Sequence, residues 1–184
     1  PAQVNKFYFW RAPALTMVPA LLTSAVIPFG SRLFGEKMVI ADLDVGPLFV
    51  FAISSLTVYG IVLAGWSSNS KYSFLGGVRS TSQMISYEIS LGLSIIPLIM
   101  IYGELNLGRI VQEQAINGWA LLPLWGEGLS LKGFILAIPL FISFVIFMTS
   151  MFAETNRLPF DLPECETELV AGYHTEYSSM KFAL

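Results

Sequence analysis

Four stretches of the chain are long and apolar enough to cross a membrane, and they constrain the fold more than any other feature. Crossing the hydrocarbon core takes about 20 mostly apolar residues. Glu88 is the single charged residue within the four stretches, which lie at 12–29, 46–66, 82–102 and 133–152. A backbone in lipid must satisfy its own hydrogen bonds, so each stretch is expected to be a helix. The sequence therefore predicts an all-α, polytopic membrane protein with one membrane domain over residues 1–184.

The composition agrees with this class and argues against several functions. Only 12% of the residues are charged, whereas soluble domains carry about 25%. The net charge of −3 and the lack of a basic cluster argue against nucleic-acid binding. Cys165 and His174 are the only residues of their types, too few for a disulfide, an iron–sulfur cluster or a haem. We expect no metal site and no bound cofactor, and we interpret both residues as bystanders.

The connections between the stretches predict how the chain is oriented. The N-terminal flank, a loop at 67–81 and the tail from 153 share one side, which has six basic residues against four on the other side. By the positive-inside rule, that side is the cytoplasm or the mitochondrial matrix. The opposite side would hold segments 30–45 and 103–132, the latter an outer loop with a short interfacial helix. Loop 67–81 is expected to be a turn that carries Lys71 and Arg79.

Glu88 is the sharpest single candidate for chemistry. If its helix starts near Ser80, Glu88 lies about 12 Å along the axis, inside the hydrocarbon, where an acid is a functional hypothesis by default. A snorkelling side chain is the alternative. One face of the predicted helix carries a polar stripe, and Glu88 lies on a different face, which favours a helix wrapped by protein or lining a cavity. The stripe consists of Gln83, Ser86, Tyr87, Ser90 and Ser94.

The tail forms a second candidate site, which we name the acidic loop (residues 153–180). Its acids are Glu154, Asp161, Glu164, Glu166, Glu168 and Glu176, and Arg157 lies among them. Acids this close are expected to titrate as a coupled group. The pattern fits a proton path as well as it fits a solvated docking surface for another subunit. Arg79 could pair with these acids from the same side of the membrane.

Two long polar blocks carry a family resemblance. "GWSSNSKYSFLGGVRSTSQMISYEISLGL" and "AETNRLPFDLPECETELVAGYHTEYSSMKFAL" resemble the hallmark segments of membrane subunit 1 of respiratory complex I, NADH:ubiquinone oxidoreductase. The resemblance implies a subunit that forms part of the quinone-binding cavity and the start of the proton path. It places Glu88, Glu154, Arg157, Asp161, Glu164, Glu166, Glu168 and Glu176 on that path or in the cavity loop. Arg79, Tyr87 and Phe160 are expected to line the cavity.

The resemblance also implies partners and a location. NADH, flavin and iron–sulfur clusters would belong to other subunits, with ubiquinone as the substrate, so the chain would not be catalytic alone. Other membrane-arm and quinone-module subunits are the expected partners. Since the family's chain is longer at both ends, we expect part of a longer subunit or a split gene product completed by a second polypeptide. The amino-acid sequences of the polar blocks resemble mitochondrial versions more than bacterial ones. We therefore expect the mitochondrial inner membrane, with a bacterial plasma membrane as the alternative.

Two other classes of function compete with this interpretation. A structural anchor or assembly subunit would use the acids only as docking contacts. A stand-alone ion-coupled transporter usually shows an inverted repeat, and the sequence has none that we can detect, so this class ranks last.

Overall fold

The computed structural model describes residues 5–30, 32–34, 36–121, 131–161 and 172, and within these the fold is almost wholly helical. The helices are α1 (Lys6–Thr23), α2 (Gly46–Ser54), α3 (Thr57–Ser67), α4 (Lys71–Tyr102), α5 (Leu107–Asn117) and α6 (Leu131–Glu154), with a 3-10 turn at Ser24–Val26. Strands β1 (Arg32–Leu33) and β2 (Glu36–Lys37) form one short antiparallel hairpin. The all-α class is confirmed, apart from this hairpin.

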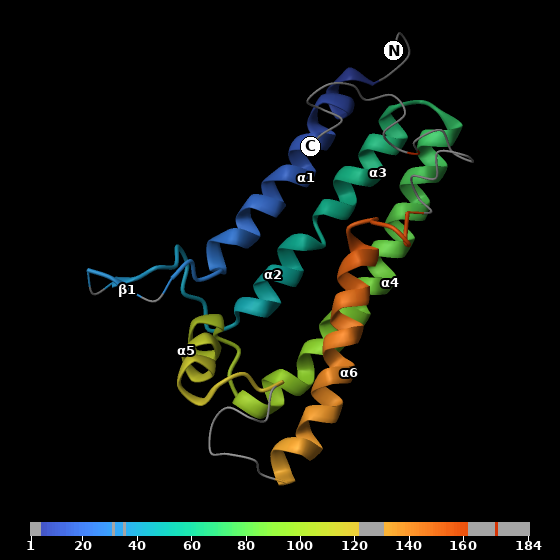
Figure 1. Ribbon diagram of the computed structural model, residues 1–184. Helices are drawn as coiled ribbons and strands as arrows, with labels where there is room; N and C mark the ends of the chain where they lie inside the picture. The colour runs from blue at the N-terminus through green and yellow to red at the C-terminus, as the bar shows by residue number, and fades with distance from the viewer. Residues whose placement is uncertain (1–4, 31, 35, 122–130, 162–171, 173–184) are drawn as a thin grey trace.

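The long helices pack side by side in one layer (Figure 1). α3 contacts α1 and α4, and α4 contacts α6. The hairpin and α5 lie together at one end of the layer, whereas the N-terminal ends of α1 and α4 lie at the other. Most large apolar side chains of the long helices are exposed, as expected where lipid or further protein covers them.

Three helical segments in the described part of the chain are long and apolar enough to cross a membrane: Gly46–Ser67, Lys71–Tyr102 and Ile135–Glu154. They correspond to three of the four predicted spans. The helix in the predicted span at 12–29 is not apolar enough to be counted with these three. Its helix begins earlier, at Lys6, and ends at Thr23. The Lys6 and Arg11 side chains in its first two turns make it more polar than the other three.

The second span is interrupted between α2, which ends at Ser54, and α3, which begins at Thr57. The hydroxyls of Ser54, Ser55 and Thr57 each donate to a backbone carbonyl three residues earlier, over 2.7–3.0 Å. Such bonds compete with the regular hydrogen bonds of a helix and bend it. The residues 46–66 that we predicted as one span are therefore two short helices in line.

α4 differs most from the prediction. The expected loop at 67–81 is wrong beyond residue 70, because helix begins at Lys71. At about 1.5 Å per residue its 32 residues extend about 48 Å, well beyond a hydrocarbon core of about 30 Å. Its first turns contain buried Ser73, Gly76, Gly77 and Ser80. These small residues allow close helix packing, so here they belong to a helix and not to the expected loop.

Glycine explains how closely α3 approaches α4. A Cβ atom at Gly65 would lie 2.7 Å from the carbonyl oxygen of Ser73 and 3.4 Å from the Cα of Phe74. Both neighbours are backbone atoms, which cannot move without shifting a helix. The contact between α3 and α4 therefore depends on the absence of a side chain at this position.

Candidate functional site

Glu88 lies near the middle of α4 rather than near its beginning. It follows Lys71, the first residue of the helix, by 17 positions, which is about 26 Å along the axis. Our expected distance of about 12 Å was too short because the helix starts nine residues before Ser80. The Glu88 side chain is half-buried.

Glu154 is the last residue of α6, and the structure brings it close to Glu88. The two side chains are half-buried, and the negative charge of Glu88 acts on the Glu154 carboxyl group. α4 and α6 pack against each other, so this pair forms across a helix interface. Of the predicted path residues in the described part of the chain, these two are brought together by the packing of α4 on α6.

α6 ends alongside the middle of α4, so that the following residues 155–161, here called the loop start, lie against α4 (Figure 1). Gln83 makes the principal contact. Its side-chain Nε2 donates to the Ala153 carbonyl at 2.7 Å, to the Phe160 carbonyl at 2.8 Å and to Asn156 Oδ1 at 3.1 Å. One amide group thus connects α4 with the end of α6 and with two residues of the loop start.

Asn156 completes the connection from the other side. It is buried, and its Nδ2 donates to the Oγ of Ser80 at 3.0 Å. Its backbone has a left-handed φ of 50°, a conformation that asparagine tolerates better than most residues. The Asn156 side chain therefore accepts from Gln83 and donates to Ser80, while its backbone supplies the turn after α6.

Aromatic packing holds the same segment. The rings of Tyr87 and Phe160 meet edge to face with their centroids 5.5 Å apart. Asp161 follows directly and is half-buried. The prediction grouped Tyr87 and Phe160 with Arg79, which is exposed eight residues earlier on α4. The structure thus brings Tyr87 and Phe160 together, whereas their role in lining a quinone cavity stays a prediction.

The remaining predicted residues have different outcomes. Arg157 is exposed on the loop start. Glu164, Glu166, Glu168 and Glu176 lie outside the described residues, as do Cys165 and His174. Gly172 is described and buried, and its carbonyl accepts a hydrogen bond from Ser73 Oγ at 3.3 Å. The chain is therefore attached to α4 both before and after Glu164, Glu166 and Glu168.

Sequence reasoning missed the role of Asn156 and Ser80. It had placed Gln83 on the polar stripe without assigning it a partner. The available signal was the recurrence of Ser80, Gln83 and Tyr87 at helical spacing, which marks one face of α4 as polar. The partners could not be named, because residues 70 or more apart must meet to form these hydrogen bonds.

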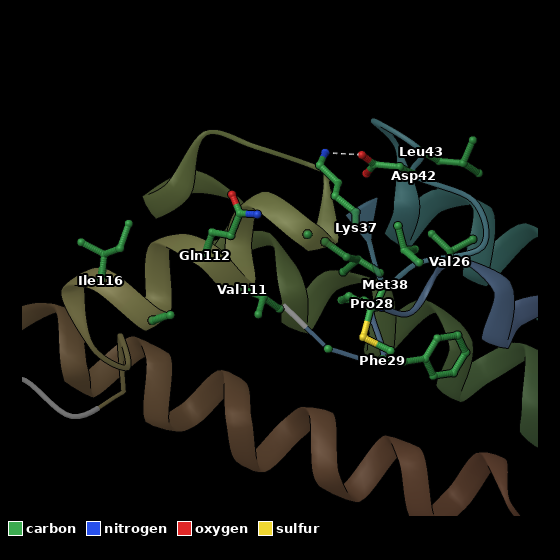
Figure 2. A pocket seen from close by; sticks show the side chains of 15 residues that line it. Val26, Pro28, Phe29, Lys37, Met38, Asp42, Leu43, Val111, Gln112 and Ile116 are labelled. Atoms are coloured by element: carbon green, nitrogen blue, oxygen red, sulfur yellow. Dashed lines mark hydrogen bonds and ion pairs between the residues drawn. The ribbon is translucent and has the colours of Figure 1, made fainter. Parts of the chain in front are cut away.

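A groove of about 630 Å³ lies at the opposite end of the molecule (Figure 2). Its walls come from residues 26–43 and from α5. Lys37 and Asp42 form an ion pair at its edge, and Asn106 Nδ2 donates to Asp42 Oδ1 at 2.8 Å. The hydrogen bond from Lys37, followed by that from Asn106, holds the pKa of Asp42 below its ordinary value.

This groove is separate from the pair of Glu88 and Glu154. Within the described residues, no group of three or more histidine, cysteine, aspartate or glutamate side chains could hold a metal ion. The half-buried acids, the polar contacts and the aromatic pair instead gather where α4, α6 and the loop start meet.

Comparison with known proteins identifies the family. A family model described as NADH dehydrogenase matches residues 1–184, the whole chain. The chain belongs to this family. The resemblance drawn from the two polar blocks is therefore confirmed.

Curated relatives agree with this membership of the NADH dehydrogenase family, and three of them are H subunits of bacterial NADH-quinone oxidoreductases. The chain is 52% identical over 184 residues to the protein of Rhodospirillum centenum and covers 48% of it. It is 50% identical over 184 residues to that of Salinibacter ruber, again covering 48%. It is 48% identical over 190 residues to one from Cytophaga hutchinsonii and covers 50%. In each case all of this chain is matched, and the chain spans about half the length of these relatives.

Proposed function

We propose that the chain is part of the membrane subunit of a proton-pumping NADH:quinone oxidoreductase, where it forms part of the quinone-binding cavity and the start of the proton path. Its relatives are named as subunits of NADH-quinone oxidoreductase. The observation that carries the proposal is the half-buried pair of Glu88 and Glu154 across the α4–α6 interface.

The physical argument is electrostatic coupling. Charges interact more strongly where water is scarce, so protonation of one acid of the pair changes the proton occupancy of the other. Reduction of a quinone consumes protons, and negative charge that develops near the loop start would act first on Asp161 and Glu154. Glu88, deeper along α4, would receive the effect next. The buried hydroxyl of Thr81, two turns from Glu88 on the same face, has no partner within the described residues and adds a polar group there.

The other residues take supporting roles in this proposal. Arg157 and Arg79 would tune the acids by charge pairing, and Tyr87 and Phe160 would line the cavity together with Arg79. Glu164, Glu166, Glu168 and Glu176 would belong to the same set of titrating groups.

The enzyme would work only as a complex. NADH, flavin and iron–sulfur clusters would be held by partner subunits, and ubiquinone would be the substrate. The partners would be other membrane-arm and quinone-module subunits. The mitochondrial inner membrane stays our prediction for its location. The relatives are bacterial, which supports the alternative of a bacterial plasma membrane.

Charge-neutral substitution of the pair tests the proposal. We expect Glu88→Gln and Glu154→Gln, each in the assembled complex, to lower quinone reduction coupled to proton translocation by at least about 100-fold, a typical contribution of a proton-transferring group. Proton translocation is measured as acidification of the interior of sealed vesicles, which quenches the fluorescence of a pH-sensitive dye. Glu113→Gln on the exposed face of α5 is the control, and it should leave both activities unchanged.

The alternative of an anchor or assembly subunit predicts the opposite result. In that case the Glu88 and Glu154 variants would change the amount of assembled complex, while each assembled complex would keep full turnover. That outcome would exclude a proton path through the pair.

A further inference from the structure

The loop start is attached to α4 by several side-chain contacts. The two N–H bonds of the Gln83 amide nitrogen are shared among three acceptors, all of which belong to residues 153–160. Two of these acceptors are backbone carbonyls, so the contact fixes the path of the main chain and not only a side chain.

The contact reaches the acids on both sides. Ala153, whose carbonyl accepts from Gln83, directly precedes Glu154. Phe160, whose carbonyl also accepts from Gln83, directly precedes Asp161. Gln83 therefore holds the peptide units that lead into two predicted path residues, and Glu88 lies five residues further along the same helix.

Asn156 keeps the chain turned between these two points. Its left-handed backbone reverses the chain after α6, and its side chain accepts from Gln83 and donates to buried Ser80. The contact of Tyr87 with Phe160 lies one helical turn from Gln83. Three consecutive turns of α4 thus contact the loop start.

We propose that Gln83 and Asn156 are positioning residues that clamp the loop start onto α4, so that Glu154 stays beside Glu88 and Asp161 stays next to the α4 contact made by Phe160. Neither residue exchanges protons with the substrate in this scheme. They set the geometry in which the acids do so. The inference rests on the proposed function, which needs the acids to be close but does not say what holds them.

Removing the donor at residue 83 is the first test. In the assembled complex, Gln83→Leu should lower the kcat of quinone reduction on the order of tenfold, because misplacement of reacting groups by about 1 Å costs at least this much. The amount of complex, and NADH oxidation with a hydrophilic acceptor that does not need quinone, should be unchanged. Gln114→Leu, the same exchange on α5, should behave as wild type.

A pH profile separates positioning from simple packing. In Gln83→Glu, the protonated carboxyl group can donate one hydrogen bond, whereas the ionised group donates none and faces three acceptors. The kcat of this variant relative to wild type should therefore rise as the pH falls. A ratio that does not vary with pH would overturn the clamp.

Asn156 supplies a second variant. Asn156→Gly keeps the left-handed backbone accessible and removes both side-chain hydrogen bonds, so the complex should assemble with lowered kcat. If Gln83→Leu and Asn156→Gly both turn over as wild type, the clamp is wrong.

The outcomes distinguish the two proposals. Wild-type turnover in the clamp variants, together with lost pumping in Glu88→Gln, would overturn the clamp and leave the proton path standing. Lowered turnover in the clamp variants, together with full pumping in Glu88→Gln and Glu154→Gln, would overturn the proton path and, with it, the role of the clamp in positioning these acids.

Discussion

At the scale of single residues, Asp42 connects two segments that lie far apart in the sequence. It pairs with Lys37 of the hairpin and accepts from Asn106. Asn106 in turn caps α5, because its Oδ1 accepts from the backbone N–H of Arg109 at 3.0 Å. Loss of the charge on Asp42 would therefore loosen both the hairpin and the beginning of α5.

We predict that this end of the molecule is acid-sensitive. The pKa of Asp42 is lower in the folded protein than in an unfolded chain, so its stabilising effect is present above the ordinary aspartate pKa and is lost as the pH falls through the lowered value. The protection of the α5 amides against hydrogen exchange should therefore fall over that range of pH. In Asp42→Asn this loss of protection on acidification should be absent. An equal loss in the variant would show that the acid sensitivity does not come from Asp42.

At the scale of elements, hydrophobic length predicted α6 well and α4 poorly. Residues 133–152 are a mostly apolar run without a charged residue, and such a run specifies a helix by itself. The first turns of α4 contain Ser73, Gly76 and Gly77, which have low helix propensity alone and form a helix because they pack closely against α3. That contact is tertiary, so the sequence pattern could not show where α4 begins.

Two glycines of these helices should respond oppositely to alanine. Gly65→Ala should destabilise the protein by about 1–3 kcal/mol, because its Cβ atom would collide with backbone atoms of α4. Gly92 has no atom of the described chain near its Cβ direction, so Gly92→Ala should stabilise α4 by up to about 1 kcal/mol. The Tm of the detergent-solubilised protein measures both, and equal Tm values would show that α3 and α4 do not approach this closely.

At the scale of the whole molecule, three spans that each cross a membrane would place the connection at 68–70 and the loop start on one side and α5 on the other (Figure 1). The alternation of connections in the sequence predicts the same arrangement. The acids Glu88 and Glu154 could likewise be singled out by residue type and position. Gln83 and Asn156 could not be paired, because only the antiparallel packing of α4 on α6 brings them together.

Labelling of introduced cysteines tests this arrangement. In a Cys165→Ser background, which removes the one native cysteine, Asn69→Cys and Leu158→Cys should react with a membrane-impermeant maleimide from the same side of sealed vesicles. Asn117→Cys should react only from the opposite side. All three parent side chains are exposed. Labelling of positions 69 and 158 from different sides would refute the three-span topology.

The continuity of α4 also restricts how such a chain can change in length. Its first turns meet α3 at Ser73, its middle meets the loop start at Gln83, and its far half faces α6 near Ser94. One residue inserted between Gln83 and Ser94 would rotate everything beyond it by about 100° and shift it by about 1.5 Å. Insertions and deletions among family members should therefore fall in the connections, such as 27–45 and 118–130, and spare α4.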